Sequence, residues 1–225
     1  LSSSSAASDV YKRQASDLMR LNKSFIIDRT GKSKREIYQG LNLASEYIED
    51  SILDKNEPIW IAQKQGRAKD GIDETDPALL KMIHLIKRKS IRINDYFNSL
   101  CFIPVAVSYE FDPNDLFKAN ELYALKKNQE YIKSDREDLN SIANGISGQK
   151  GLVNLNIGPP IIFKEDDYET CARLISQSIL KLYKLQPSNF AACDIQNINY
   201  TLDCNFSNNQ IQLAKDYLEE RTKTL

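Results

Sequence analysis

One stretch of the chain brings glycine, cationic side chains and a helix start within a few residues of each other. Gly66 and Gly71 allow the backbone to take positive φ angles and to approach a ligand closely. Arg67 and Lys69 place positive charge in the same turn. The pair Asp76-Pro77, which follows, is typical of the first turn of a helix. The stretch therefore predicts an anion site, and the alternative is a solvated loop between a strand and a helix.

The elements on either side of this turn have their own sequence signals. Residues 59–62 are apolar, follow Pro58 and give way to polar residues at once, which predicts a short strand ahead of the turn. Residues 25–27 predict an earlier strand of the same kind. Ser33 and Glu36 form a capping box, so we expect a helix from there to about residue 54.

The remaining pattern continues this alternation of strands and helices. Residues 102–109 are nearly all apolar and β-branched, which predicts a central strand buried on both faces. The order of strand, helix, strand and helix predicts an α/β fold, in which helices cover a central, mostly parallel or mixed sheet. Further strands are expected at 152–157 and 161–163, and further helices at about 77–89, 115–127, 134–147, 167–185 and 208–225.

Composition excludes several classes of site and partner. The chain has 225 residues with 30 Lys+Arg against 31 Asp+Glu, and a net charge of −1 gives no global attraction to nucleic acid. The four cysteines are far apart and His84 is the one histidine, so we expect neither a zinc site nor any other metal site. No apolar run approaches the roughly 18 residues that suggest a membrane-spanning helix.

The two ends of the chain lead to an expectation about its domains. Residues 1–14 have no apolar core of a signal peptide, and the run 9–14 resembles the in-frame translation of a sequencing adaptor. We expect residues 1–14 to be a non-native segment and residues 15–225 to be a partial domain with a helical extension at its C-terminal end. On this interpretation the sheet is incomplete, because the N-terminal part of the domain is absent.

Three stretches stand in a fixed order, at residues 24–29 (Ser-Phe-Ile-Ile-Asp-Arg), 65–71 (Gln-Gly-Arg-Ala-Lys-Asp-Gly) and 103–108 (Ile-Pro-Val-Ala-Val-Ser). Together they resemble the second, third and fourth motifs of the glycerolipid acyltransferases, and most closely a bacterial group of that superfamily. The likeness covers about residues 23–194. It implies transfer of an acyl group from acyl-CoA or acyl carrier protein to a hydroxyl of glycerol-3-phosphate or lysophosphatidic acid, in phospholipid biosynthesis and without a cofactor.

The resemblance implies a role for individual residues. Gln65 stands where the family usually has Glu, and a neutral amide cannot orient Arg67 by charge. Pro104 and Val105 match the fourth motif, which in the family shapes the acyl-binding side of the site, and they are equally suited to a core strand. The residues implied on the acceptor-phosphate side are Arg29, Gln65, Gly66, Arg67, Lys69 and Gly71.

The first motif of the family, His-x4-Asp, does not occur in this sequence. In the family its histidine is the general base that activates the acceptor hydroxyl for attack on the thioester. His84 lies after the third motif, so we expect it to be a packed or surface residue. No catalytic residue is assigned within the chain, and the base is expected upstream of residue 15.

Two other classes of function stay open. The missing histidine and Gln65 are also what a non-catalytic phosphate-binding or membrane-surface-binding module of the same fold would show. A nucleotide-binding domain is disfavoured, because the chain has neither Gly-x4-Gly-Lys-Ser/Thr nor Gly-x-Gly-x-x-Gly. For the acyltransferase we expect a cytoplasmic location at the inner face of the cytoplasmic membrane. The basic run 87–92 would then make peripheral contact with anionic lipid.

Overall fold

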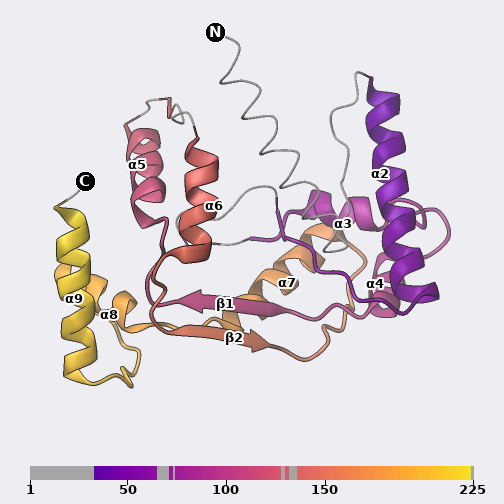
Figure 1. The fold of residues 1–225 in the computed structure, drawn as a ribbon. Helices are drawn as coiled ribbons and strands as arrows, with labels where there is room; N and C mark the ends of the chain where they lie inside the picture. Colours follow the sequence, from indigo (N-terminus) through magenta and orange to yellow (C-terminus); the bar gives the residue numbers. More distant parts are fainter. Residues whose placement is uncertain (1–32, 65–70, 73, 128–129, 132–135, 224–225) are drawn as a thin grey trace, which may run out of the picture. The chain divides into compact units, whose positions relative to one another are not determined.

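The computed structural model describes residues 33–64, 71–72, 74–127, 130–131 and 136–223 (Figure 1). These residues form helices and one two-stranded antiparallel sheet. The chain divides into two compact units. The first contains the described residues up to Trp60 together with Leu80–Arg92, and the second contains Ile61–Leu79 and the residues from Ile93 onward.

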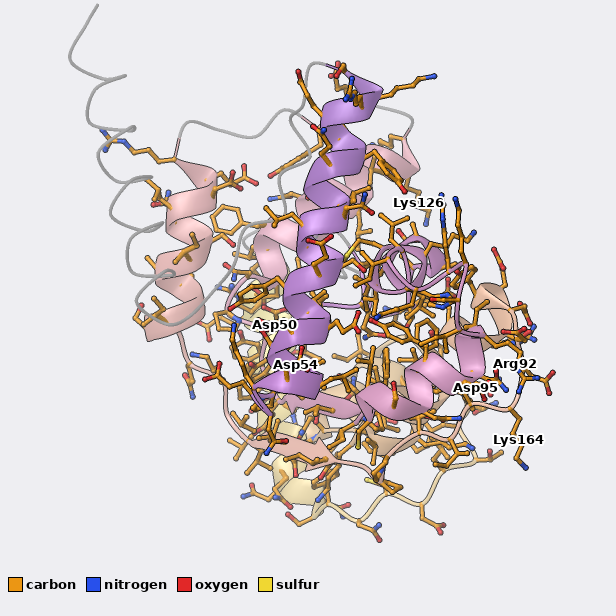
Figure 2. The ribbon with its side chains drawn as sticks, turned by 90° about the vertical axis from the view of Figure 1, so that its right-hand side faces the viewer. Asp50, Asp54, Arg92, Asp95, Lys126 and Lys164 are labelled. Carbon is orange, nitrogen blue, oxygen red and sulfur yellow. The ribbon has the colours of Figure 1, made fainter. Side chains whose placement is uncertain are left out.

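The first unit is built on helix α2 (Lys34–Glu49), which continues into the π-helical turn η1 (Asp50–Asp54). Ser33 caps α2, because its side-chain oxygen accepts a hydrogen bond from the Glu36 amide at 3.2 Å. Inside the unit the Ser45 hydroxyl donates to the Ile83 carbonyl at 2.8 Å, which joins α2 to the end of α3 (Pro77–Ile83). Figure 2 labels Asp50 at the end of α2, where Lys55 pairs with it.

The second unit contains the sheet and the remaining helices. Its strands pair in one antiparallel register, with Val107 opposite Leu155. Its elements are α4 (Ile93–Leu100), β1 (Val105–Tyr109), α5 (Asp115–Lys126), α6 (Glu137–Ser147), β2 (Val153–Ile157), α7 (Tyr168–Leu182), α8 (Pro187–Ile195) and α9 (Asn208–Thr222).

The sheet has one covered face and one open face. Ala106 and Ser108 point to the covered face and are buried. There the fully buried Gln186, which precedes α8, donates from Nε2 to the Ser108 hydroxyl at 2.9 Å. The Asn156 side chain, on β2, donates to the Leu182 carbonyl at the end of α7, at 2.7 Å. These two hydrogen bonds fix α7 and α8 to the same side of the sheet.

An aromatic cluster forms the core beneath α4. The Phe97 side chain is 0% exposed, and its ring centroid lies 5.2 Å from that of Phe102 and 5.4 Å from that of Phe163. Tyr168, at the start of α7, lies 6.5 Å from the same ring. One side chain of α4 thus holds together the segment before β1, the segment after β2 and the first turn of α7.

The α/β fold expected from the sequence is wrong. The sheet among the described residues has two antiparallel strands and does not form a parallel or mixed layer between helices. Residues 59–62 are irregular, and the Trp60 side chain is 74% exposed. Residues 161–163 are also irregular, although the Ile161 amide donates to the Phe102 carbonyl at 2.8 Å. An apolar run shows that a segment can be buried, but it does not say which segment it pairs with.

The expected helices are mostly confirmed, with shifted ends. β1 and β2 are also confirmed, but β1 alternates between buried and half-exposed positions instead of being buried on both faces. α3 ends at Ile83 because residues 84–90 form turns, in which the Lys87 amide donates to the His84 carbonyl at 3.0 Å. α4 and α8 were not expected. The expected strand at 25–27 and the first two residues of the helix expected at 134–147 lie outside the described residues.

Replacing Phe97 by alanine should lower the free energy of unfolding of the second unit by about 3–5 kcal/mol, because a buried aromatic side chain is replaced by a cavity. Urea denaturation followed by circular dichroism measures this. Leu180→Ala, on α7, is the matched control, because the Leu180 side chain is 72% exposed and surface changes cost about 0.5 kcal/mol or less. Equal losses for the two variants would contradict the assigned core.

Candidate functional site

The loop at residues 64–74, which contains the stretch 65–71 singled out in the sequence, has its two ends joined by hydrogen bonds. The Asp76 amide donates to the Gln63 carbonyl at 2.9 Å, and the Thr75 hydroxyl donates to the Gln63 side-chain oxygen at 2.8 Å. The Lys64 ammonium donates to the Ile72 carbonyl at 3.2 Å. The described ends of the loop therefore lie together within the second unit.

The described part of this loop agrees with its sequence signals. Gly71 has a φ of +78°, a value that glycine adopts at little cost, and it is exposed. The Asp76 carboxylate accepts a hydrogen bond from the Ala78 amide at 2.8 Å, so the helix start predicted at Asp76-Pro77 is confirmed. The residues expected to bind phosphate that lie outside the described part of the chain are Arg29, Gln65, Gly66, Arg67 and Lys69.

Helix α7 holds the closing end of the loop. The Thr75 amide donates to the Ser176 side-chain oxygen at 2.9 Å, and the Ser176 hydroxyl donates to the Ala172 carbonyl, also at 2.9 Å. Thr75 is 7% exposed and Ser176 is half-buried, so this contact is partly buried. Sequence reasoning missed Ser176, because a serine within an amphipathic helix carries no signal of a partner 101 residues away.

The two residues of the fourth motif lie where the chain enters β1. Pro104 is buried, and its carbonyl accepts a hydrogen bond from the Gly158 amide at 2.9 Å. A Cβ atom at Gly158 would lie 2.9 Å from both the Pro104 ring and the Leu182 side chain, so only glycine fits between them without a shift. Val105 follows as the first, half-buried residue of β1. The second unit thus contains both the ends of the 64–74 loop and the fourth motif.

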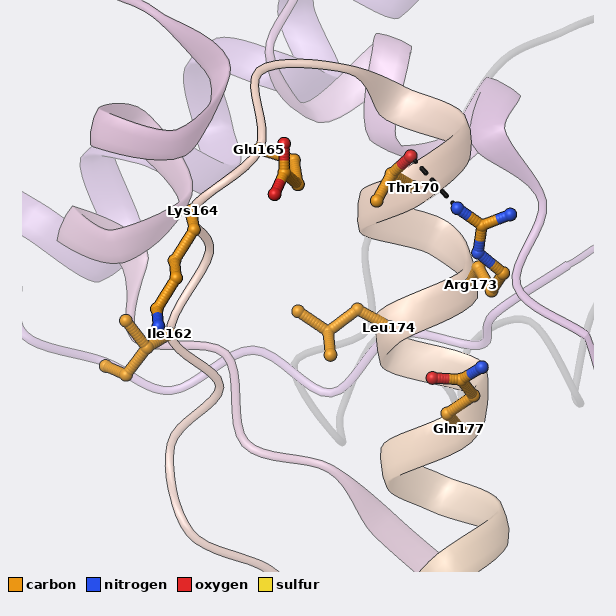
Figure 3. Close-up of a pocket in the computed structure, with 7 residues that line it drawn as sticks. All are labelled: Ile162, Lys164, Glu165, Thr170, Arg173, Leu174 and Gln177. Atoms are coloured by element: carbon orange, nitrogen blue, oxygen red, sulfur yellow. Dashed lines mark hydrogen bonds between the residues drawn. The ribbon is translucent and has the colours of Figure 1, made fainter.

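A shallow cavity of about 320 Å³ lies between α7 and the segment at 162–165. Figure 3 shows Leu174 and Glu165 pointing into it. Lys164 runs along one wall, whereas Arg173 extends from the other side of α7 and donates to the Thr170 hydroxyl at 3.2 Å. The two cations do not converge, so the cavity has no anion site of its own. Its lining residues are Ile162, Lys164, Glu165, Thr170, Arg173, Leu174 and Gln177.

Neither His84 nor Cys171 is placed for catalysis. His84 is 2% exposed, and its Nε2 lies 3.0 Å from the Ile91 carbonyl, both within the first unit, so its expected packed role is confirmed. Burial raises the pKa of the Cys171 thiol to about 11, which leaves it protonated near neutral pH and a poor nucleophile. Among the described residues, no group of three His, Cys, Asp or Glu side chains could hold a metal ion.

The basic run after α3 is partly engaged with α2 inside the first unit. The Lys87 ammonium lies 2.9 Å from the Glu49 carboxylate, which raises the pKa of Lys87. The Arg88 guanidinium lies 5.9 Å from the centre of the Tyr38 ring. Within the described ranges, no helix combines the length and the apolar character needed to cross a membrane.

No protein-family model matches the chain, and comparisons with curated proteins and with solved structures found no match either.

Proposed function

We propose that the chain carries the acceptor-phosphate half of a glycerolipid acyltransferase, which moves an acyl group from acyl-CoA or acyl carrier protein to a hydroxyl of glycerol-3-phosphate or lysophosphatidic acid. The observation that carries the proposal is the 64–74 loop. Its sequence resembles the family's third motif, with Gln65 in place of the usual Glu, and its ends are joined at Gln63. The fold does not support the proposal, since the expected α/β sheet is absent from the described residues. The support comes from the motif-like stretches and from this loop.

A loop with joined ends suits phosphate binding for two physical reasons. Its ends are already ordered in the free protein, so binding costs less conformational entropy than in a free-ended segment. The sequence places Arg67, whose guanidinium can donate two parallel hydrogen bonds to a phosphate, between Gly66 and Gly71. With a net charge of −1, the chain attracts an anion only where its cations are concentrated, as they are in this stretch.

The open face of the sheet supports the acyl side of the proposal. Val105 and Val107 are half-exposed on β1, and their partners Ile157 and Leu155 on β2 are exposed. These side chains form cross-strand apolar pairs on one face, and nothing in the described part of the chain replaces water over Leu155 or Ile157. An acyl chain in contact with this face would remove apolar area from water, worth about 25 cal/mol per Å².

A second candidate is a phosphate-binding module without catalysis. Gln65 stands where the family usually has an acidic residue, and the His84 side chain is buried, which leaves little of its imidazole open to a substrate hydroxyl. The reading frame upstream distinguishes the two candidates. A His-x4-Asp block before Lys23 in the gene supports the enzyme, and a complete gene without one supports the binding module.

As part of this proposal, the protein works in the cytoplasm at the inner face of the cytoplasmic membrane, where a glycerolipid product would be used. Support comes from Lys89, which is exposed next to Arg88 in the basic run. An exposed lysine contributes about 1 kcal/mol of binding free energy near an anionic bilayer.

Replacing Arg67 by alanine should weaken the binding of glycerol-3-phosphate to the 225-residue chain by about 10- to 100-fold, the effect of a lost charge-assisted hydrogen bond. Arg67→Lys should lose less, because it keeps the charge but not the planar fork. Titration calorimetry measures all three affinities. Equal losses would show that fork geometry is irrelevant, and no binding by the unchanged chain would remove the proposal.

Made as these 225 residues, the protein should not transfer acyl groups, because the sequence lacks the His-x4-Asp motif whose histidine is the family's general base. A general base contributes typically about 10²–10⁴-fold in rate. The assay supplies labelled glycerol-3-phosphate or lysophosphatidic acid with acyl-CoA or acyl carrier protein, and a known acyltransferase serves as the positive control. Turnover by the chain itself would show that it holds a base that we have not assigned.

The chain should sediment with vesicles that contain anionic lipid, and Lys89→Glu should weaken this association several-fold at low salt. Lys126→Glu is the matched control, because Lys126 is also exposed but lies in α5 of the second unit. Association that ignores both salt and lipid charge would contradict an electrostatic contact.

A further inference from the structure

We infer that the outer edge of strand β2 pairs with the same edge of a second copy of the chain, which gives a two-fold symmetric dimer with one continuous sheet. The residues that form this edge are Val153, Leu155 and Ile157. The contact uses backbone groups at the edge of the sheet and leaves its open face uncovered. It is therefore compatible with the proposed function and does not depend on it.

The register of the sheet shows which backbone groups of β2 point outward. The Gly158 amide donates to the Pro104 carbonyl at 2.9 Å, and the Glu110 amide donates to the Leu152 carbonyl at 2.8 Å. In an antiparallel ladder, hydrogen-bonded pairs of residues alternate with pairs that are not hydrogen-bonded. Between these two pairs, the even-numbered residues of β2 therefore bond to β1. The N–H and C=O groups of the odd-numbered residues point away from β1.

This edge is open and carries no protection of its own. Within the described part of the chain, the outward N–H and C=O groups of β2 have no hydrogen-bond partner. Exposed strand edges in natural proteins usually carry a charge or a proline that prevents pairing. β2, with the sequence Val-Asn-Leu-Asn-Ile, contains neither. Such an edge can accept another extended strand.

The edge of β2 is complementary to itself. With the two-fold axis at Leu155, this residue lies opposite its own copy, and Val153 lies opposite Ile157 of the second copy. Every outward N–H of one chain then meets a C=O of the other. The cross-strand side-chain pairs are all apolar, and no ionised side chain on β2 opposes the pairing. A second copy is thus the partner that this edge fits.

The outer edge of β1 is the less accessible of the two edges. Its outward residues Val105 and Val107 are half-buried, whereas Val153, Leu155 and Ile157 of β2 are 52%, 59% and 66% exposed. A second strand can therefore approach β2 more easily than β1. This difference assigns the contact to β2.

The contact ends where β2 ends. The next outward positions are Gly151 and Pro159. Gly151 has a φ of +60°, which turns the chain out of the extended conformation, and Pro159 has no N–H to donate. An interface this short lies at the low end of interface sizes, below about 1,200 Å² in total. We therefore expect a weak dimer, with a dissociation constant between about 1 μM and 1 mM.

The experiment measures the mass of the full 225-residue chain by sedimentation across that concentration range. Leu155→Pro removes an outward N–H but no hydrogen bond to β1, and Leu155→Val is the matched control, because it keeps both the N–H and an apolar side chain. The unchanged chain and Leu155→Val should dimerise. Leu155→Pro should dimerise about 10- to 100-fold more weakly, the effect of the two hydrogen bonds lost across the axis.

A pair of charged variants tests the register and does not depend on whether Leu155→Pro folds. Leu155→Lys and Leu155→Glu each place like charges opposite one another at the axis, so each variant alone should stay monomeric. An equal mixture of the two should dimerise, because opposite charges then face each other. Leu155 is exposed in the single chain, so circular dichroism should show both variants folded.

Amide exchange gives a second readout on the unchanged chain. As its concentration rises, the Leu155 amide should exchange more slowly, because dimerisation supplies its hydrogen-bond acceptor. The amides of Asn154 and Asn156 should not change, since they already bond to β1 in the single chain.

Three results would overturn the inference. The first is a monomer at every concentration, and the second is a dimer that Leu155→Pro leaves as strong as before. The third is a mixture of the Lys and Glu variants that stays as monomeric as each variant alone. None of them changes the test of the proposed function, which measures the binding of glycerol-3-phosphate.

Discussion

The second unit depends on the burial of one face of helix α7. That face carries Cys171, Ala172 and Ile175, and the first residue of the helix, Tyr168, reaches the aromatic cluster around Phe97. The last residue of the helix accepts the hydrogen bond from Asn156 of β2. A helix fixed at both ends and along one side is a rigid support, and the segments that carry the third and fourth motifs both attach to it.

Helix starts were predicted correctly from the sequence, because they depend on residues that are neighbours in the chain. Ser33 caps α2 and Asp76 starts α3, because a cap is decided by a side chain and an amide a few residues apart. The pairing of strands failed for the opposite reason. The apolar residues at 59–62 and 161–163 have the composition of a strand. A segment becomes a strand only when it pairs with another segment, and among the described residues β1 and β2 pair only with each other.

In the candidate site, too, features set by a single residue could be predicted from the sequence, and features set by distant residues could not. Gly71 could be predicted, because a positive φ is a property of a single residue and glycine accepts it most readily. The contact of Ser176 could not, since its partner, the Thr75 amide, is far away in the sequence and only the folded chain brings the two together. Gly158 is a related case, in which a glycine is required by the Pro104 ring and the Leu182 side chain rather than by its own backbone angles.

Trp60 gives this protein an optical property that follows from its exposed position. The sequence contains one tryptophan, so all indole fluorescence comes from a side chain just ahead of Gln63, the residue at which the 64–74 loop closes. With 74% of its surface in contact with water, that indole emits from a polar environment and is open to collisional quenchers. Its spectrum and its quenching therefore report on one known position in the chain, without any attached dye.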